Sequence, residues 1–331
     1  MSNTKLVTPT EAARLIEAGR TLLLAGDETI LSSLPNGSWI GGTAANFITA
    51  DGGVTDQAHV LVTDITDYAA SVDVRVYDEA SLPTLGDDYS DRGFSVIILP
   101  GMSAIHSAFA RNVQGYAGVF NSPLIGWIAG VHLSEVGVRA PKSFAGDGLT
   151  RGSEAVVMHV TLPQGLSAHL DIINLFKQGV GPAIEFDGEG FEVEGNCRID
   201  GKAANLARFI TDQGVDTQLP LVADFNGAMI NVSIQSVDVE AGRVTLYAPV
   251  FKGVTYRFAE PISDYVAEFA RQVGEKAEQS TVFSCNCILN YAYANLEGKR
   301  TGDFVGPVTF GEIAYMLLNQ TLAYLTVDKV H

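Results

Sequence analysis

Two apolar stretches decide the fold class, FSVIIL at residues 94–99 and PLIGWIAG at residues 123–130. Short apolar runs that are bounded by turn residues are typical of fully buried strands. Between the two stretches, Ser103 is predicted to cap a helix that runs to Val113. This succession of strand, helix and strand indicates a protein of the α/β or α+β class.

The same kinds of signal predict further helices and strands on both sides of this region. Thr8-Pro9-Thr10-Glu11 predicts the start of a helix that ends at Gly19, because it supplies a cap, a first-turn proline and a first-turn acid. Asp200 and Pro261 are predicted to open two later helices. Further strands are expected at residues 21–25, 38–43, 59–63, 72–77, 154–162, 184–186, 191–194, 227–235, 243–248 and 281–285. This mixture predicts an α/β fold, or mixed α+β, in which mixed β-sheets are layered with helices.

A break at Pro163-Gln164-Gly165 divides the pattern into two parts. Strand signals end just before this break and restart at residue 184. A chain of 331 residues also has room for about two domains. We therefore expect two sub-domains, residues 1–165 and residues 166–331, each built on a mixed β-sheet layered with helices.

The net charge of the chain indicates which classes of binding partner are not expected. Its 38 aspartates and glutamates outnumber its 21 lysines and arginines, which gives a formal net charge of −17. Such a surface repels phosphate backbones and anionic lipids, so neither nucleic acid nor a membrane is expected as a partner. No apolar run approaches the ~20 residues of a bilayer span, and the first residues lack the pattern of a signal peptide. Since three cysteines fit a reducing compartment, we expect a cytoplasmic protein.

Four short motifs in the second half resemble the C-terminal part of the FIST domain. They are Asp200-Gly201-Lys202-Ala203-Ala204, Val282-Phe283-Ser284-Cys285, Phe310-Gly311-Glu312-Ile313 and Asn319-Gln320-Thr321-Leu322. The region from Pro123 to Leu162 is more loosely similar to the end of the FIST N-terminal part. The chain is therefore identified as a diverged, stand-alone FIST protein, with residues 1–165 and 166–331 as its two parts.

The resemblance implies a function in sensing. It implies a bacterial signal-transduction protein that binds a small molecule, such as an amino acid or a similar metabolite, and acts through a separate output protein. Some FIST proteins bind haem, so haem is an alternative ligand. The chain departs from the family at Ile288, where arginine is common, and at Cys287, where glycine is usual. These departures put in doubt any ligand that the arginine would hold.

Six residues are candidates for the ligand site: Trp39, Gly126, Trp127, Cys285, Glu312 and Asn319. Glu312 would hold a ligand amine, or would lie at a helix start as a carboxylate on the dipole. Asn319 would bond a ligand or anchor a turn. We expect Gly126, Cys285, Glu312 and Asn319 to converge on one concavity, with Trp39 or Trp127 as an apolar wall.

The cysteines leave a second class of function open. Cys285 and Cys287 would share one face of a strand, and Cys197 would be a third partner for a metal. A C-x-C pair is a weak zinc signal, however, and buried cysteines usually pack as small apolar side chains. An enzyme that uses Cys285 or Cys287 as nucleophile, with Glu312 or a histidine as base, is the alternative to binding without turnover.

Two histidines and one serine complete the candidates. His106 or His132 would be the axial ligand if the protein binds haem, since one histidine suffices, although a surface or core role is the alternative for both. Ser103 lies in a stretch similar to the G-x-S-x-G nucleophile motif, but the last glycine is missing, and a helix cap explains the serine better. The sequence therefore predicts no catalytic residue and no metal site.

Overall fold

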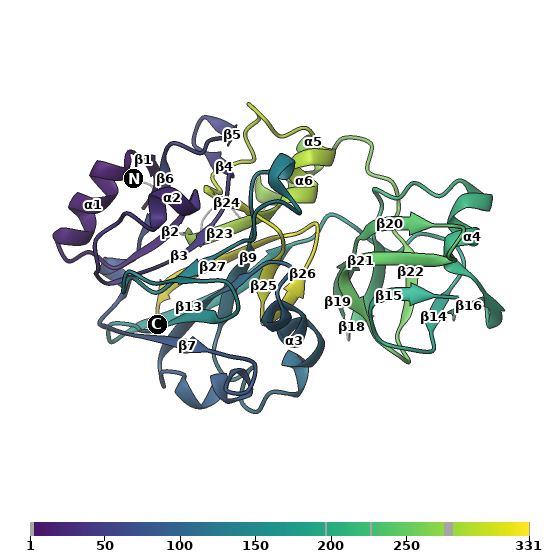
Figure 1. The fold of residues 1–331 in the computed structure, drawn as a ribbon, viewed down its shortest axis with the longest axis horizontal. Coiled ribbons are helices and arrows are strands. Elements are labelled where there is room, and N and C mark those ends of the chain that lie inside the picture. The colour runs from purple at the N-terminus through teal and green to yellow at the C-terminus, as the bar shows by residue number, and fades with distance from the viewer. Residues whose placement is uncertain (1–2, 196, 226, 275–280, 331) are drawn as a thin grey trace. The chain divides into compact units, whose positions relative to one another are not determined.

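The computed structural model describes residues 3–195, 197–225, 227–274 and 281–330 (Figure 1). Strands make up 43% of the chain and helices 19%, in five mostly antiparallel sheets, which confirms the predicted mixed α/β class. By its internal contacts the chain forms two compact units. The first unit comprises Met1–Ile173, Ala270–Leu317 and Leu322–His331, and the second comprises Asn174–Phe269 and Leu318–Thr321. Whether residues 1–165 and 166–331 form separate domains stays a prediction.

The described residues of the first unit form three six-stranded sheets. One has the strand order β1 (Thr4–Val7), β6 (Val60–Asp64), β2 (Leu22–Gly26), β3 (Trp39–Thr43), β10 (Ser143–Phe144) and β11 (Thr150–Arg151). The next has the order β26 (Met316–Leu318), β25 (Glu312–Ala314), β9 (Leu124–Ala129), β8 (Gly93–Pro100), β12 (Ala155–Thr161) and β7 (Ser71–Tyr77). The third has the order β13 (Leu166–Ile173), β27 (Leu322–Lys329), β23 (Thr281–Cys287), β24 (Gly306–Thr309), β4 (Asn46–Thr49) and β5 (Gly52–Thr55).

Strands that are far apart in the sequence lie side by side in the third sheet (Figure 1). The teal strand β13 pairs with the yellow strand β27 over its whole length. On the far side of the sheet, β24 pairs with β4, so that Val308 lies opposite Asn46. The first unit is therefore completed by strands that the chain adds last.

The apolar side chains of the first unit pack into two cores on opposite faces of the first sheet. Leu23 and Ile40 point into a core that they share with β8, β9, β12, β23 and β27. Leu22 and Trp39 point the other way and pack with helix α1 (Pro9–Glu17). Because successive side chains alternate between the faces of a strand, burial on both faces requires an unbroken apolar run such as LLLAG in β2.

The second unit has two sheets among its described residues. The larger has the order β17 (Lys202–Ala204), β16 (Cys197–Ile199), β14 (Ile184–Phe186), β22 (Thr255–Phe258), β18 (Leu221–Phe225) and β19 (Ala228–Val232). The smaller has the order β15 (Gly190–Glu194), β21 (Arg243–Val250) and β20 (Ile234–Asp238). The pairs in both sheets are antiparallel.

Two predicted helix starts are correct and two are wrong. Thr8 caps α1, and Ser103 caps α3 (Ala104–Asn112), each by accepting a backbone N–H with its hydroxyl. Asp200 does not open a helix, because it lies in the turn between β16 and β17 with a positive φ of 48°. The helix that follows, α4 (Leu206–Gln213), is capped by Asn205.

The second wrong prediction is that Pro261 opens a helix. Helix α5 (Tyr265–Gly274) begins later, because the carboxylate of Asp264 accepts the N–H of Ala267 and so caps it. Two short helices, α2 (Glu28–Leu31) and α6 (Ile288–Tyr293), complete the elements that matter for the site.

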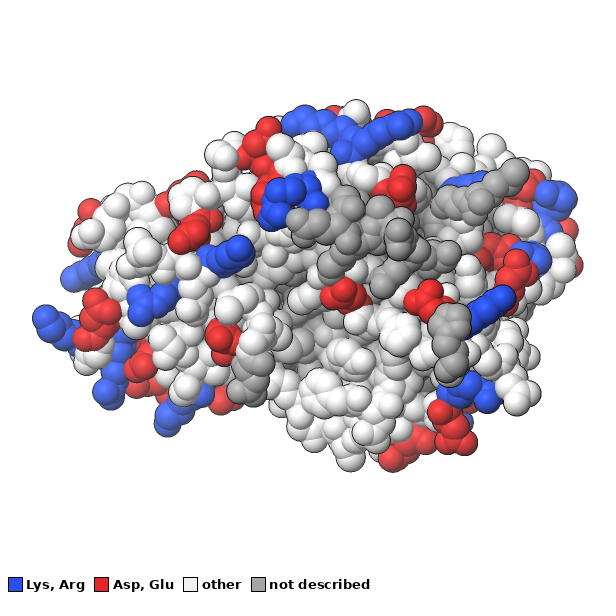
Figure 2. All heavy atoms as spheres, turned by 180° about the vertical axis from the view of Figure 1, so that it is seen from behind, with Lys and Arg blue, Asp and Glu red and all other residues white. Residues whose placement is uncertain are grey.

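The surface is charged but mixed in sign. On the face drawn in Figure 2, acidic and basic side chains are interspersed. Across the ranges that the structure describes, no helix combines the length and the apolar character that crossing a bilayer requires.

Candidate functional site

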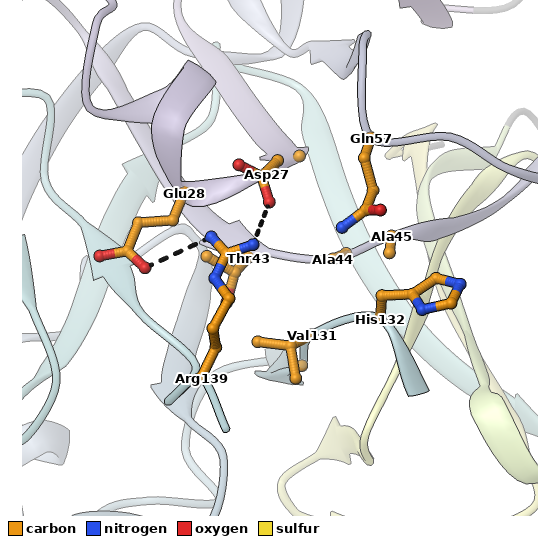
Figure 3. Close-up of a pocket in the computed structure, with 11 residues that line it drawn as sticks. Asp27, Glu28, Thr43, Ala44, Ala45, Gln57, Val131, His132 and Arg139 are labelled. Carbon is orange, nitrogen blue, oxygen red and sulfur yellow. Dashed lines mark hydrogen bonds and ion pairs between the residues drawn. The ribbon is translucent and has the colours of Figure 1, made fainter. Parts of the chain in front are cut away.

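A pocket lies in the first unit where three strands reach their carboxyl ends (Figure 3). Gly26 ends β2, Thr43 ends β3, and Gly130 follows β9. The β2–β3 pair is parallel, and so is the β8–β9 pair of the neighbouring sheet. The two sheets meet here, since the N–H of Gly130 donates to the carbonyl of Thr43 at 2.8 Å. Ligands of open α/β sheets bind outside the carboxyl ends of the strands, which makes this pocket the candidate site.

Local interactions fix the segments that form the pocket. Asp27 caps helix α2, because its carboxylate accepts the N–H of Thr29 at 2.9 Å. The hydroxyl of Thr43 accepts the N–H of Lys142 at 2.9 Å. A Cβ at Gly130 would collide with the ring of Phe310, so any larger residue would force that ring to move. The strand ends are therefore held before any ligand arrives.

Arg139 crosses the pocket and joins three carboxylates. Its Nη1 lies 2.8 Å from Oδ2 of Asp27 and 3.2 Å from Oε2 of Glu135, and its Nη2 lies 3.6 Å from Oε2 of Glu28. Figure 3 shows the guanidinium between Asp27 and Glu28. Burial raises the pKa of Asp27, but hydrogen bonds from Arg139 and Thr29 outweigh burial and hold that pKa below its ordinary value. The hydrogen bond to Asp27 also raises the pKa of Arg139.

The opposite side of the pocket carries His132 and Gln57 (Figure 3). Nδ1 of His132 lies 3.3 Å from the backbone N–H of Ser134 and accepts from it, which assigns the proton of a neutral ring to Nε2. The amide of Gln57 donates to Glu135 at 3.2 Å. The pocket is thus lined by an imidazole and an amide as well as by the groups of its ion pairs.

The pocket is small and negatively charged in this conformation. The free space is about 10 Å³, which is room for roughly one water molecule. Three carboxylates surround one guanidinium, so the site carries two excess negative charges when His132 is neutral. Such an arrangement favours a cationic group over an anionic one.

Four of the six predicted site residues lie together, in the core of the first unit. Glu312 in β25 lies directly opposite Trp127 in β9, and Gly126 lies opposite Ile313. The thiol of Cys285 donates to the carbonyl of Gly126 at 3.3 Å. Glu312 is 0% exposed, and the hydroxyl of Thr309 lies 3.4 Å from its Oε1. These residues form a buried cluster rather than the walls of the pocket in Figure 3.

Trp39 and Asn319 lie elsewhere. Trp39 packs in the core beside α1, and its indole N–H donates to the carbonyl of Pro35 at 2.9 Å. Asn319 belongs to the second unit, where its backbone carbonyl accepts a hydrogen bond from the buried side chain of Asn231 at 3.0 Å. Neither residue lines the pocket in Figure 3.

The cysteines and His106 are also buried. Burial raises the pKa of the Cys285 thiol well above its ordinary value, and the nearby charge of Glu312 adds to this effect. Burial raises the pKa of Cys197 to about 11. A thiol with a raised pKa is a poor nucleophile at neutral pH, which weighs against the cysteine-enzyme alternative. Burial lowers the pKa of His106 to about 4, and its Nδ1 accepts the N–H of Met102 at 3.3 Å.

The sequence contains signals for the pocket that motif searches miss. Asp27 and Glu28 come just after the strand predicted at residues 21–25, and His132 comes just after the one predicted at residues 123–130. The decisive partner, Arg139, is 112 residues from Asp27 and lies in no motif. Within the described ranges, no group of three or more His, Cys, Asp or Glu side chains is placed to hold a metal ion.

Comparison with known families corrects the predicted relationship. The model of a family of unknown function, DUF6976, matches residues 7–328, and no FIST model matches. The prediction of a FIST protein is therefore wrong. Its motifs were only four or five residues long, and one of them, Asp200–Ala204, forms a strand turn rather than the expected helix start. A search of curated proteins finds no match to this chain.

Proposed function

Because this chain belongs to the DUF6976 family, whose function is unknown, we propose a function from the pocket itself. The protein binds a small amine-bearing metabolite, such as an amino acid, at the strand-end pocket and does not turn it over. The observation that carries this proposal is the excess of carboxylates around Arg139 at the carboxyl ends of β2, β3 and β9.

The charges of the pocket select an ammonium group. Asp27, Glu28 and Glu135 share a single guanidinium, so each carboxylate retains capacity to accept further hydrogen bonds. Charge-assisted hydrogen bonds are roughly twice as strong as neutral ones. An ammonium group would therefore gain more here than a neutral or anionic group of the same size.

The segment that carries His132 and Arg139 provides the way in. A metabolite is larger than the present free space, so this segment has to move outward when the ligand binds. It has little buried apolar surface to hold it, because Leu133 is 49% exposed and Val138 is 84% exposed. Segments with few buried contacts open at low free-energy cost.

We place the protein in the cytoplasm, because none of its three cysteines is joined in a disulfide. Binding would serve signal transduction through a separate output protein. The two compact units would act as two sub-domains, with the amine pocket in the first.

A thermal-shift screen of paired compounds tests the binding. Each primary amine, from ethanolamine to amino acids and polyamines, is compared with its N-acetylated form, which lacks the positive charge. A ligand that binds only the folded state at a hundredfold excess over its Kd stabilises it by about 2.7 kcal/mol. We expect stabilisation by an amine and none by its acetylated partner, with the compound recovered unchanged. No shift with any amine, or steady conversion of a stabilising amine, would contradict the proposal.

A further inference from the structure

The second unit contains a larger hollow that the amine pocket does not involve. Its volume is about 590 Å³, and it lies between the loop at residues 180–182, helix α4 and strand β22. Pockets for small ligands usually measure about 300–1,000 Å³ and are mostly apolar with a few polar groups. This hollow has the volume of a ligand site.

Apolar side chains form part of the walls of the hollow. Phe209 of α4 and Phe258 of β22 are both partly exposed and line it, together with Pro182 and Val215. The buried face of α4 consists of other residues, namely Leu206, Ala207 and Ile210. Phe209 is therefore not needed for the core contact of its own helix and is free to contact a ligand.

Arg257 supplies the polar group. Its guanidinium donates to the carbonyl of Gly181, and no carboxylate among the described residues lies within ion-pair distance of it. Ion pairs to carboxylates are formed by Arg14, Arg20, Arg75, Arg139, Arg151, Arg198, Arg243 and Arg300. Some N–H donors of the planar Arg257 guanidinium therefore remain available to an acceptor on a ligand.

The loop over the hollow is held in place. The N–H of Gly179 donates to the carbonyl of Phe258 at 2.9 Å, and a Cβ on this glycine would lie only 2.8 Å from that oxygen. At the other end, Ala183 donates its N–H to the carboxylate of Asp200 at 2.9 Å. This bond occupies part of the carboxylate, which is the one acidic side chain that lines the hollow. A loop that is held before binding lowers the cost of ordering the site.

We propose that this hollow binds a small carboxylate with an apolar body, with the carboxylate on the Arg257 fork and the body between Phe209 and Phe258. Arginine matches a carboxylate in a bidentate geometry, and aromatic rings cover an apolar body. This site is separate from the amine pocket, and the inference does not depend on the function proposed for that pocket.

Calorimetric titration of the full chain with 3-phenylpropionate and with 3-phenylpropanamide tests the site. The two compounds share one apolar body, and only the first carries a charge. We expect the acid to bind at least about tenfold more tightly than the amide, since the bidentate pair is charge-assisted. Equal affinities, or no detectable binding of the acid, would overturn the proposal.

Variants locate the binding. Arg257→Gln and Phe209→Ala should each weaken binding of the acid at least about tenfold. Arg208→Gln is the matched control, because Arg208 is an exposed arginine of α4, next to Phe209, that does not line the hollow. Circular dichroism checks the fold of each variant. If Arg257→Gln does not fold, Arg257→Lys replaces it, with weaker binding expected because lysine lacks the fork. Wild-type affinity in the folded Arg257 variant, or an equal loss in Arg208→Gln, would overturn the proposal.

Discussion

The hydroxyl oxygen of Ser95 lies 2.8 Å from Nδ1 of His159, and both side chains are buried. Nε2 of the same ring lies 3.0 Å from the hydroxyl of Tyr77, which donates to the carboxylate of Asp88 at 2.7 Å. Both ring nitrogens are thus engaged in one chain of hydrogen bonds, which a neutral imidazole can satisfy. Burial lowers the pKa of His159 to about 4, although the charges of Asp88 and Asp73 oppose this shift.

The buried histidines predict that the folded protein loses stability in mild acid. His159 and His106 both have a folded-state pKa of about 4 against an unfolded value of 6.5. Above pH 6.5 neither state takes up a proton, so the free energy of unfolding is unaffected. Between pH 6.5 and 4 the unfolded chain binds protons that the folded chain does not, and stability falls. By pH 5 the loss should be on the order of 1–2 kcal/mol for each histidine, measured by urea denaturation.

His159→Gln isolates the contribution of one histidine. Glutamine keeps a donor and an acceptor but does not titrate. The variant should be less stable than the wild type at pH 8, because the hydrogen-bond geometry is poorer. Its further loss between pH 7.5 and 5 should be smaller by the contribution of one histidine. An unchanged pH slope would show that His159 takes up its proton as readily in the folded protein as in the unfolded chain.

Gly126 was predicted to line a ligand site, and the structure gives it a packing role that can be tested. A Cβ at this position would collide with the backbone carbonyl of Ile97 on the neighbouring parallel strand. Gly126→Ala should therefore destabilise the protein by about 3 kcal/mol or more in chemical denaturation. Gly115→Ala is the control, since a Cβ there meets nothing within 4 Å. Wild-type stability of Gly126→Ala would show that the strands are spaced differently.

The buried thiols predict slow chemical modification. Cys197, Cys285 and Cys287 are all buried and unbridged, and burial raises the pKa of Cys197 and of Cys285. Iodoacetamide at pH 7 should label none of them on the timescale that labels a free thiol, and it should label all three in urea. Mass spectrometry identifies the sites. Rapid labelling of Cys285 or Cys287 in the folded protein would revive the enzyme alternative.

The sequence predicted those helices and strands that are determined by neighbouring residues, such as a cap or an apolar run. The strand at residues 94–99, the cap at Ser103 and the strand at residues 123–130 all appear, as β8, α3 and β9. The helix start predicted at Asp200 was wrong, because a polar residue beside glycine fits a strand turn as well as a helix cap. Element starts of this kind depend on which neighbour offers the better hydrogen bond.

The arrangement of the first unit could not be predicted, because it depends on pairs that are far apart in the sequence. β24 joins β4, and β27 joins β13, without any local pattern that names the partner. Alternation and apolarity predict that a strand is buried, but not beside which strand. The candidate pocket has the same origin, since Arg139 reaches Asp27 only after two sheets have met.

The proposed function depends most on Asp27, which both caps α2 and pairs with Arg139. The variant Asp27→Asn separates these two roles. Asparagine caps a helix as well as aspartate does, so α2 should remain capped. The variant loses the charge that pairs with Arg139, which should cost about 1 kcal/mol of stability because the pair is partly exposed. An amine that stabilises the wild type should bind at least about tenfold more weakly. Asp51→Asn is the matched control, because that carboxylate is 98% exposed and lies 3.6 Å from Arg300. If amine binding survives in Asp27→Asn, or falls equally in Asp51→Asn, the ammonium group is not held in this pocket.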